Sequence, residues 1–153
     1  MRDELYEHEL NRNAARMTRI LDGFHGRREG FSETDLLAIQ RALQILVESV
    51  IGMSRYVAEV ALGIRVAKSR ESLDELCSAG VLDRGTHANL MKIVGFRNVL
   101  VHDYLNVDDA VVEAIVRNRE YGFLLDVLSG LTGHLERRCG SDGYSVASDA
   151  KCE

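Results

Sequence analysis

The chain has 153 residues, a formal net charge of −5 at pH 7, and neither proline nor tryptophan. This length suits one domain with a substantial hydrophobic core. The mildly acidic balance argues against a general nucleic-acid binder, whose surface carries a basic stripe, but not against an enzyme that grips one or two phosphates in a local cleft. The absence of proline favours long, uninterrupted helices, because proline breaks them.

The rest of the composition gives no sign of a membrane, secreted or metal-binding protein. We expect no apolar run long enough to cross a bilayer, and the acidic start MRDELYEHEL lacks the basic and apolar regions of a signal peptide. Three cysteines without CxxC spacing provide neither a disulfide framework nor a zinc motif. We therefore expect a cytoplasmic protein with reduced thiols, no metal and no cofactor.

Apolar periodicity predicts an all-helical domain over residues 1–138. A first helix is expected from about Asp3 to Phe24, before a glycine-rich break. Ser32 is a plausible N-cap for a long second helix. Two apolar series repeat in that helix every seven residues: Leu36, Leu43, Val50, Val57 and Ile64, and Ile39, Leu46, Met53 and Val60. Such a heptad seam, about 50 Å long at 1.5 Å per residue, predicts packing in a helical bundle.

Four shorter helices are expected after the long one. They are a short helix around Glu71–Ser78 stopped by Gly80, a helix from near Asp83 into the central motif, a short helix over Asp108–Val116, and a last helix from an N-cap at Asn118 to about Arg138. Residues 139–153 are small, polar and non-periodic, which predicts a flexible C-terminal tail. The expected architecture is an up-and-down bundle with one long, heptad-patterned second helix.

The fourth helix carries the run RNVLVHDY, residues 97–104, in an otherwise apolar segment. His102 can exchange protons near neutral pH, because the pKa of an imidazole is about 6.5. Arg97 stays charged and can bind two phosphate oxygens through its planar fork. Metal-free cleavage of RNA to a 2′,3′-cyclic phosphate needs such a pair, a group that moves protons and a fixed cation for the phosphate. We therefore interpret Arg97 and His102 as candidate catalytic residues.

Helical geometry constrains how these side chains can meet. Asn98 and His102 lie four residues apart on one face, so Asn98 could orient the imidazole or bind the sugar. Arg97 precedes His102 by five residues, or about 140° around the helix. The two converge if the helix ends near His102 or if a second copy of the motif faces the first, so we expect a homodimer with Gly95 at the interface. Tyr104 could stack on a base or accept a covalent modification.

Structural interpretations of the same residues are open. An Arg-x4-His spacing is common on helices, and a histidine near a helix C-terminus is an ordinary stabilising device. The remaining histidines have no partner at metal-ligand spacing, and the Arg-Arg pairs of the chain fit solvated charges better than a nucleic-acid footprint. On this interpretation the chain is a plain helical scaffold whose motif forms a dimer contact.

The motif RNVLVHDY resembles the R-x4-H-x-Y signature of the HepT toxins, a branch of the HEPN superfamily, and the helix order resembles theirs over residues 1–138. The resemblance implies the toxin of a type II toxin–antitoxin system, a dimeric, metal-independent endoribonuclease with a composite site at the dimer cleft. Arg97 and His102 match the catalytic pair, and Asn98 matches the polar residue that often follows the arginine. An MntA-like nucleotidyltransferase antitoxin is implied as the partner, which transfers AMP from ATP to Tyr104.

One alternative within the same superfamily is a non-catalytic HEPN accessory protein that presents a nucleotide or substrate to a nucleotidyltransferase. The intact pair of Arg97 and His102 favours the enzyme over this accessory and over the scaffold. The resemblance assigns no role to residues 139–153, and the acidic net charge fits RNA binding poorly.

Overall fold

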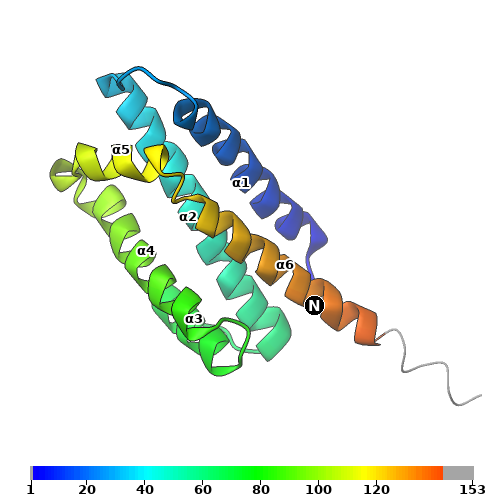
Figure 1. Cartoon of the computed structure of the whole chain (residues 1–153). Coiled ribbons are helices and arrows are strands. Elements are labelled where there is room, and N and C mark those ends of the chain that lie inside the picture. Colours follow the sequence, from blue (N-terminus) through cyan, green and yellow to red (C-terminus); the bar gives the residue numbers. More distant parts are fainter. Residues whose placement is uncertain (1, 143–153) are drawn as a thin grey trace, which may run out of the picture.

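The computed structural model describes residues 2–142, which form six α-helices and one short 3-10 helix without any strand (Figure 1). The predicted all-helical class and helix order are confirmed. In chain order the elements are α1 (Glu4–His25), α2 (Glu33–Leu62), α3 (Ser69–Ser78), α4 (Arg84–His102), η1 (Tyr104–Asn106), α5 (Asp109–Arg117) and α6 (Gly122–Asp142).

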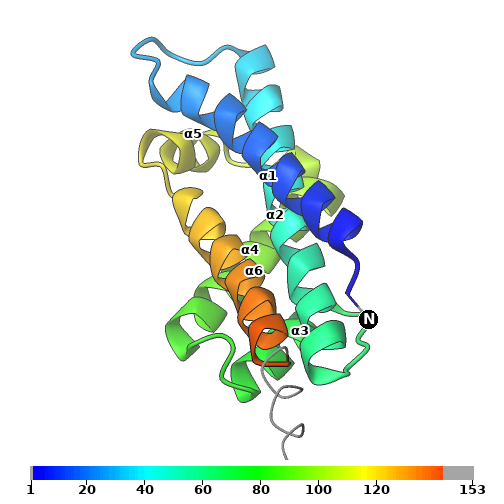
Figure 2. The ribbon, with the colours of Figure 1, turned by 90° about the vertical axis from the view of Figure 1, so that its right-hand side faces the viewer.

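Helix α2 is the centre of the bundle, and every other α-helix of the described chain packs against it. Helices α1 and α6 run along it, α3 and α4 pair with each other near its C-terminal end, and α5 lies across its N-terminal half (Figures 1 and 2). The motif helix α4 therefore rests on the most buried element of the protein, which gives a rigid support to any site built on it.

The ends of α2 are set by local chemistry. Ser32 forms a capping box with Asp35: its hydroxyl accepts from the Asp35 amide at 3.1 Å, and the Asp35 carboxylate accepts from the Ser32 amide at 2.9 Å. At the other end Gly63 adopts a left-handed conformation with φ of 68°, which stops the helix. The helix is thus 30 residues long, about 45 Å, and the predicted last heptad position, Ile64, falls outside it.

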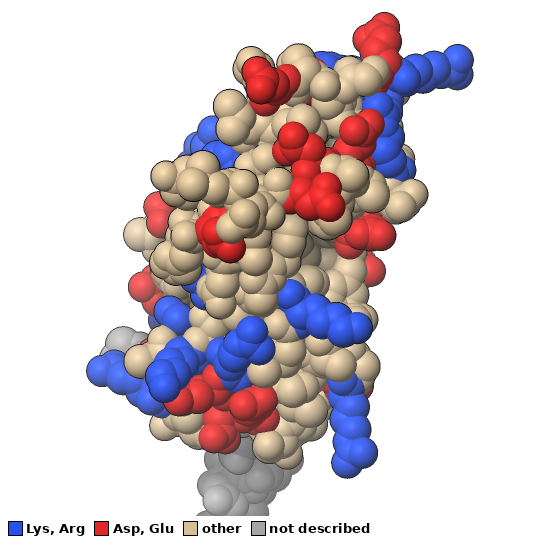
Figure 3. Space-filling view, turned by 90° about the vertical axis from the view of Figure 1, so that its left-hand side faces the viewer, with Lys and Arg blue, Asp and Glu red and all other residues tan. Residues whose placement is uncertain are grey.

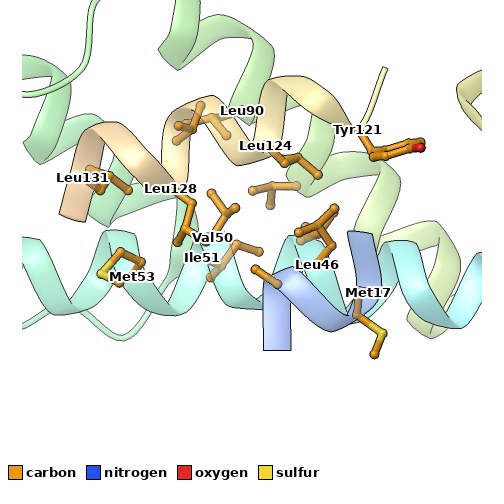
Figure 4. Close-up of a cluster of buried hydrophobic side chains, with 14 of the residues drawn as sticks. Met17, Leu46, Val50, Ile51, Met53, Leu90, Tyr121, Leu124, Leu128 and Leu131 are labelled. Atoms are coloured by element: carbon orange, nitrogen blue, oxygen red, sulfur yellow. The ribbon is translucent and has the colours of Figure 1, made fainter. Parts of the chain in front are cut away.

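The heptad positions inside the helix do form the core, as predicted. Six of them are at most 2% exposed: Ile39, Leu43, Leu46, Val50, Met53 and Val57. Figure 4 shows part of this cluster, in which side chains of α2 such as Leu46 and Val50 lie among Met17 of α1 and Leu124 and Leu128 of α6. The heptad positions of α2 therefore pack against several helices, whereas in a two-stranded coiled coil they would pack against one.

The apolar character of α2 would also suit a membrane span, since one 18-residue window has a mean hydropathy of 1.5. The expectation that no segment is long and apolar enough was wrong. In the bundle half of that window is buried against the other helices, as in the core helix of a globular domain. Packing within the bundle accounts for the hydropathy of α2.

The C-terminal third contains two further departures from the sequence prediction. Asn118 does not cap the last helix; it ends α5, donating its backbone N–H to Ala114 O at 2.9 Å. Arg119 then adopts a positive φ of 50°, and its guanidinium pairs with Asp22 of α1 at 3.0 Å, so the chain turns before α6 begins at Gly122. Helix α6 continues to Asp142, beyond the predicted boundary at residue 138, and the remaining residues of the expected tail, 143–153, lie outside the described part.

A buried carboxylate joins the start of α1 to α2. Glu7 accepts hydrogen bonds from Arg2 Nε at 2.8 Å and from the Tyr56 hydroxyl at 2.8 Å, and only 8% of its side chain is exposed. The hydrogen bond from Arg2 lowers the pKa of Glu7 below its usual 4.5, against the opposing effect of burial.

This pKa shift predicts a pH dependence of stability. A carboxyl whose folded pKa is depressed stabilises the fold above its unfolded pKa and loses that contribution as the pH falls through the folded value. The free energy of unfolding should therefore decrease as the pH drops below about 4.5, and this decrease should be shallower in Glu7→Gln. Urea denaturation between pH 3 and 7 measures both; identical slopes in the two proteins would refute the assignment.

Candidate active site

The predicted motif lies at the C-terminal end of α4. Asp83 begins the helix by accepting from the Thr86 amide at 2.7 Å, and His102 is its last residue. The next element is η1, which starts at Tyr104 and is held by the Asn106 amide group donating to the Asp103 carboxylate at 2.6 Å. The helix therefore ends at His102, which is one of the two conditions that the spacing set for bringing Arg97 and His102 together.

The exposure of the motif side chains differs along the helix. Asn98 and His102 are exposed, and Tyr104 is 68% exposed on η1. Arg97 is different, because only 18% of its side chain is exposed. The imidazole, the amide and the phenol can thus meet a ligand from solvent, whereas the guanidinium is held within the bundle surface.

Two residues from other helices hold Arg97. Its Nη2 donates to the hydroxyl of Ser69, the first residue of α3, at 3.2 Å, and its Nη1 lies 3.4 Å from the Glu48 carboxylate on α2. No hydrogen bond or ion pair joins Arg97 to His102 within residues 2–142. One chain therefore presents the two groups separately although α4 ends at His102, so the end of the helix does not by itself bring them together.

The sequence did not indicate Glu48 or Ser69 as part of this site. Ser69 lies 28 residues before Arg97, at the start of a short helix, and Glu48 is one polar residue on the outer side of a long apolar helix. Nothing in their local pattern distinguishes them from ordinary surface residues. Only the packing of α2, α3 and α4 brings them together.

Charged side chains of both signs lie on the surface around α4. In Figure 3, Asp and Glu side chains are frequent in the upper part of this face, and a group of Lys and Arg side chains lies in the lower part, with further Asp and Glu side chains directly beside and below it. Exposed carboxylates close to the end of α4 in sequence include Asp103, Asp108 and Asp109. A chain of net negative charge thus presents a local group of cations, which binding of a phosphate requires.

The structure offers two other features to compare with the motif. A cleft of about 460 Å³ between α2, α4, α5 and α6 is lined mainly by apolar side chains, among them Val47, Phe96 and Tyr121, and includes neither Arg97 nor His102. Among residues 2–142 no group of three or more His, Cys, Asp or Glu side chains is placed to hold a metal ion. The motif places an exposed histidine at the last position of α4 and a partly buried arginine earlier on the same helix.

A comparison of the sequence with known protein families agrees with the motif and with its place in the fold. The family described as "Ribonuclease HepT-like" matches residues 10–128, most of the chain. The chain therefore belongs to the HepT-like family of ribonucleases. No curated protein sequence matches it.

Solved structures with the same fold include toxins of toxin–antitoxin complexes. A tri-AMPylated HEPN toxin from Shewanella oneidensis, in complex with MNT antitoxin, has 20% identity and a TM-score of 0.66 over 87% of this chain and 99% of that chain. A mutant MntA–HpeT toxin–antitoxin gives 20% identity and 0.71 over 84% and 98%. The cytosolic protein YutE of unknown function, from Bacillus subtilis, gives 20% identity and 0.71 over 87% and 92%. At this identity the likeness establishes the HEPN-like fold.

Proposed function

We propose that this chain is the toxin of a type II toxin–antitoxin system and acts as a metal-independent endoribonuclease, with Arg97 and His102 as its catalytic pair. The observation that carries the proposal is that α4 ends at an exposed His102, while the same helix presents Arg97 fixed by Ser69 and Glu48. Membership of a ribonuclease family supports the same reaction.

The two side chains divide the chemistry of RNA cleavage. The His102 imidazole takes the proton of a ribose 2′-hydroxyl, whose oxygen then attacks the adjacent phosphorus. The bond from phosphorus to the 5′-oxygen breaks, this oxygen receives a proton from an imidazolium, and a 2′,3′-cyclic phosphate remains. Arg97 stabilises the additional charge on the phosphorane-like transition state. Asn98, on the same exposed face as His102, orients the imidazole or the sugar.

The active form in this proposal is a homodimer. Arg97 and His102 of one chain do not contact each other, whereas two copies of α4 related by a twofold axis place each arginine opposite the other copy's histidine. The exposed face of α4 with Asn98 and His102 is then covered. The composite site is complete only at this interface.

RNA cleavage by the purified protein tests this function directly. We expect cleavage of a single-stranded RNA to persist in EDTA, and the products to end in a 2′,3′-cyclic phosphate, measured by mass spectrometry. Loss of cleavage in EDTA would refute the metal-independent mechanism. No cleavage under any condition would favour the alternative of a non-catalytic HEPN accessory protein.

We also propose that a MntA-like nucleotidyltransferase antitoxin silences the chain by AMPylating Tyr104. The phenol is 68% exposed, two residues after His102. Its oxygen attacks the α-phosphorus of ATP, loses its proton, and displaces pyrophosphate. The attached AMP places a negative charge and a bulky base beside the RNA site, with the electrostatic consequences of a phosphorylation.

Co-expression of the chain with such a partner is expected to increase its mass by one or more adenylyl groups on Tyr104 and to abolish RNA cleavage. The variant Tyr104→Phe should stay unmodified and active, because it keeps the ring but lacks the nucleophilic oxygen. Intact-protein and peptide mass spectrometry measure the modification. An unmodified tyrosine in a fully silenced complex would show that the partner acts by steric blocking instead.

A further inference from the structure

A group of cations surrounds Arg97 on the side of α2 and α3. The Ser69 hydroxyl accepts from Arg97 Nη2 at 3.2 Å and also from Arg55 Nη2, on α2, at 3.1 Å. Ser69 is only 6% exposed, whereas Arg55 is exposed. One buried oxygen therefore fixes two guanidinium groups from different helices beside each other.

A third guanidinium lies close to the same helix face. Arg70 follows Ser69, and its Nη2 lies 3.7 Å from the place that a Cβ on Gly95 would occupy. The Arg70 guanidinium therefore lies beside α4 at Gly95, at the distance of an ordinary van der Waals contact. Arg70 is itself exposed and has no ion-pair partner within residues 2–142.

The charges of this group are not balanced. Glu48 is the one carboxylate that an ion pair joins to it within the described chain, and 45% of its side chain is exposed. Of the three guanidinium groups, Arg97 is the one that this partly solvated carboxylate pairs with in the described chain. Like charges held together repel, and a bound anion removes that repulsion.

Arg97 also keeps an unused donor. Its Nε–H is buried and has no hydrogen-bond partner in the part of the chain that the structure describes. A guanidinium presents five N–H donors in a fork that matches the oxygens of a phosphate. The long contact to Glu48, at 3.4 Å, is weak enough for a phosphate oxygen to replace it.

We propose that Arg55 and Arg70 form a second phosphate subsite, which binds the RNA phosphate next to the one held by Arg97, and that Ser69 positions Arg55 and Arg97 relative to each other. RNA as the ligand rests on the proposed function. The subsite lies at the level of Gly95, seven residues or about 10 Å along the helix axis from His102. An RNA strand therefore runs along α4 from the histidine toward the start of α3.

The test measures RNA binding as a function of salt, with the full chain carrying His102→Ala so that RNA is not cleaved. Each phosphate contact in a single strand contributes about 0.7 to the slope of log K against log salt concentration. Adding Arg55→Gln and Arg70→Gln together removes this one phosphate contact and should lower the slope for a 12-nucleotide RNA by about 0.7, and each substitution alone should lower it by part of that amount. Arg41→Gln is the matched control on α2, since Arg41 is exposed and bonds Gln44 alone; it should leave the slope unchanged.

A dinucleotide, which has one bridging phosphate, does not reach the subsite and should compete equally well in every variant. Slopes that equal those of the parent and of Arg41→Gln would overturn the subsite, as would equal losses for the dinucleotide and the longer RNA. Ser69→Ala should also lower the slope, and Ser69→Thr, which retains the hydroxyl, should restore it. If the unsubstituted chain fails to cleave RNA but these slopes change as expected, the nuclease function fails and the phosphate subsite stands.

Discussion

Replacing His102 with alanine is expected to lower the rate of RNA cleavage by about 10²–10⁴-fold, which is the usual contribution of a general acid–base group. The imidazole is exposed at the last position of α4, so its loss should change the melting temperature little. Initial rates on a single-stranded RNA and thermal melts measure the two effects. His8→Ala is the matched control, because His8 is exposed on α1, far from the motif in sequence.

A mixing experiment extends this prediction to the composite site. Arg97→Ala and His102→Ala should each be inactive alone, but unfolding and refolding them together produces heterodimers. If each site takes its arginine and its histidine from different copies, half of the sites in a heterodimer are intact and cleavage returns. Failure of the mixture to cleave RNA, with heterodimers shown to form, would place both residues of a site on one chain.

Replacing Leu46 with alanine is expected to lower the free energy of unfolding by about 2–5 kcal/mol. Leu46 is fully buried in the middle of α2, among side chains of the helices that surround it (Figure 4). The substitution removes buried methyl groups and leaves a cavity that the neighbouring helices cannot fill without moving. Urea denaturation, followed by circular dichroism, measures the loss.

Leu37→Ala on the same helix is the control for Leu46. The Leu37 side chain is 66% exposed in the single chain, so the same truncation should change stability by no more than about 0.5 kcal/mol. A loss of less than about 1 kcal/mol for Leu46→Ala would contradict the central position of α2 in the core.

The helices themselves were predictable because their signals are local. A heptad pattern, an N-cap such as Ser32 or Asp83 and a glycine after the last turn act within a few residues of the chain. The predicted helices therefore appear in the right order, with starts within a few residues of those observed for α1 to α5.

The predicted helix ends were wrong where tertiary contacts or the backbone conformation of one residue decided where a helix stops or starts. The apolar series of α2 continued to Ile64, but Gly63 adopted a left-handed conformation and ended the helix first. Asparagine is a residue type that favours the N-cap position, but Asn118 follows the last residue of α5 as its C-cap. The chain turns there with Arg119, whose ion pair with Asp22 of α1 could not be recognised from residues 97 positions apart.

The motif could also be recognised from the sequence alone. Its residues Arg97, Asn98, His102 and Tyr104 lie within eight consecutive positions, and helix geometry gives the angles between those on the helix. The environment of Arg97 was decided by the tertiary structure alone. Ser69, Glu48 and Arg55 reach the motif from α3 and α2, and the 3.6-residue period orders side chains only around one helix axis. Which helices meet, and at what height along α4, depends on the packing of all their buried faces at once.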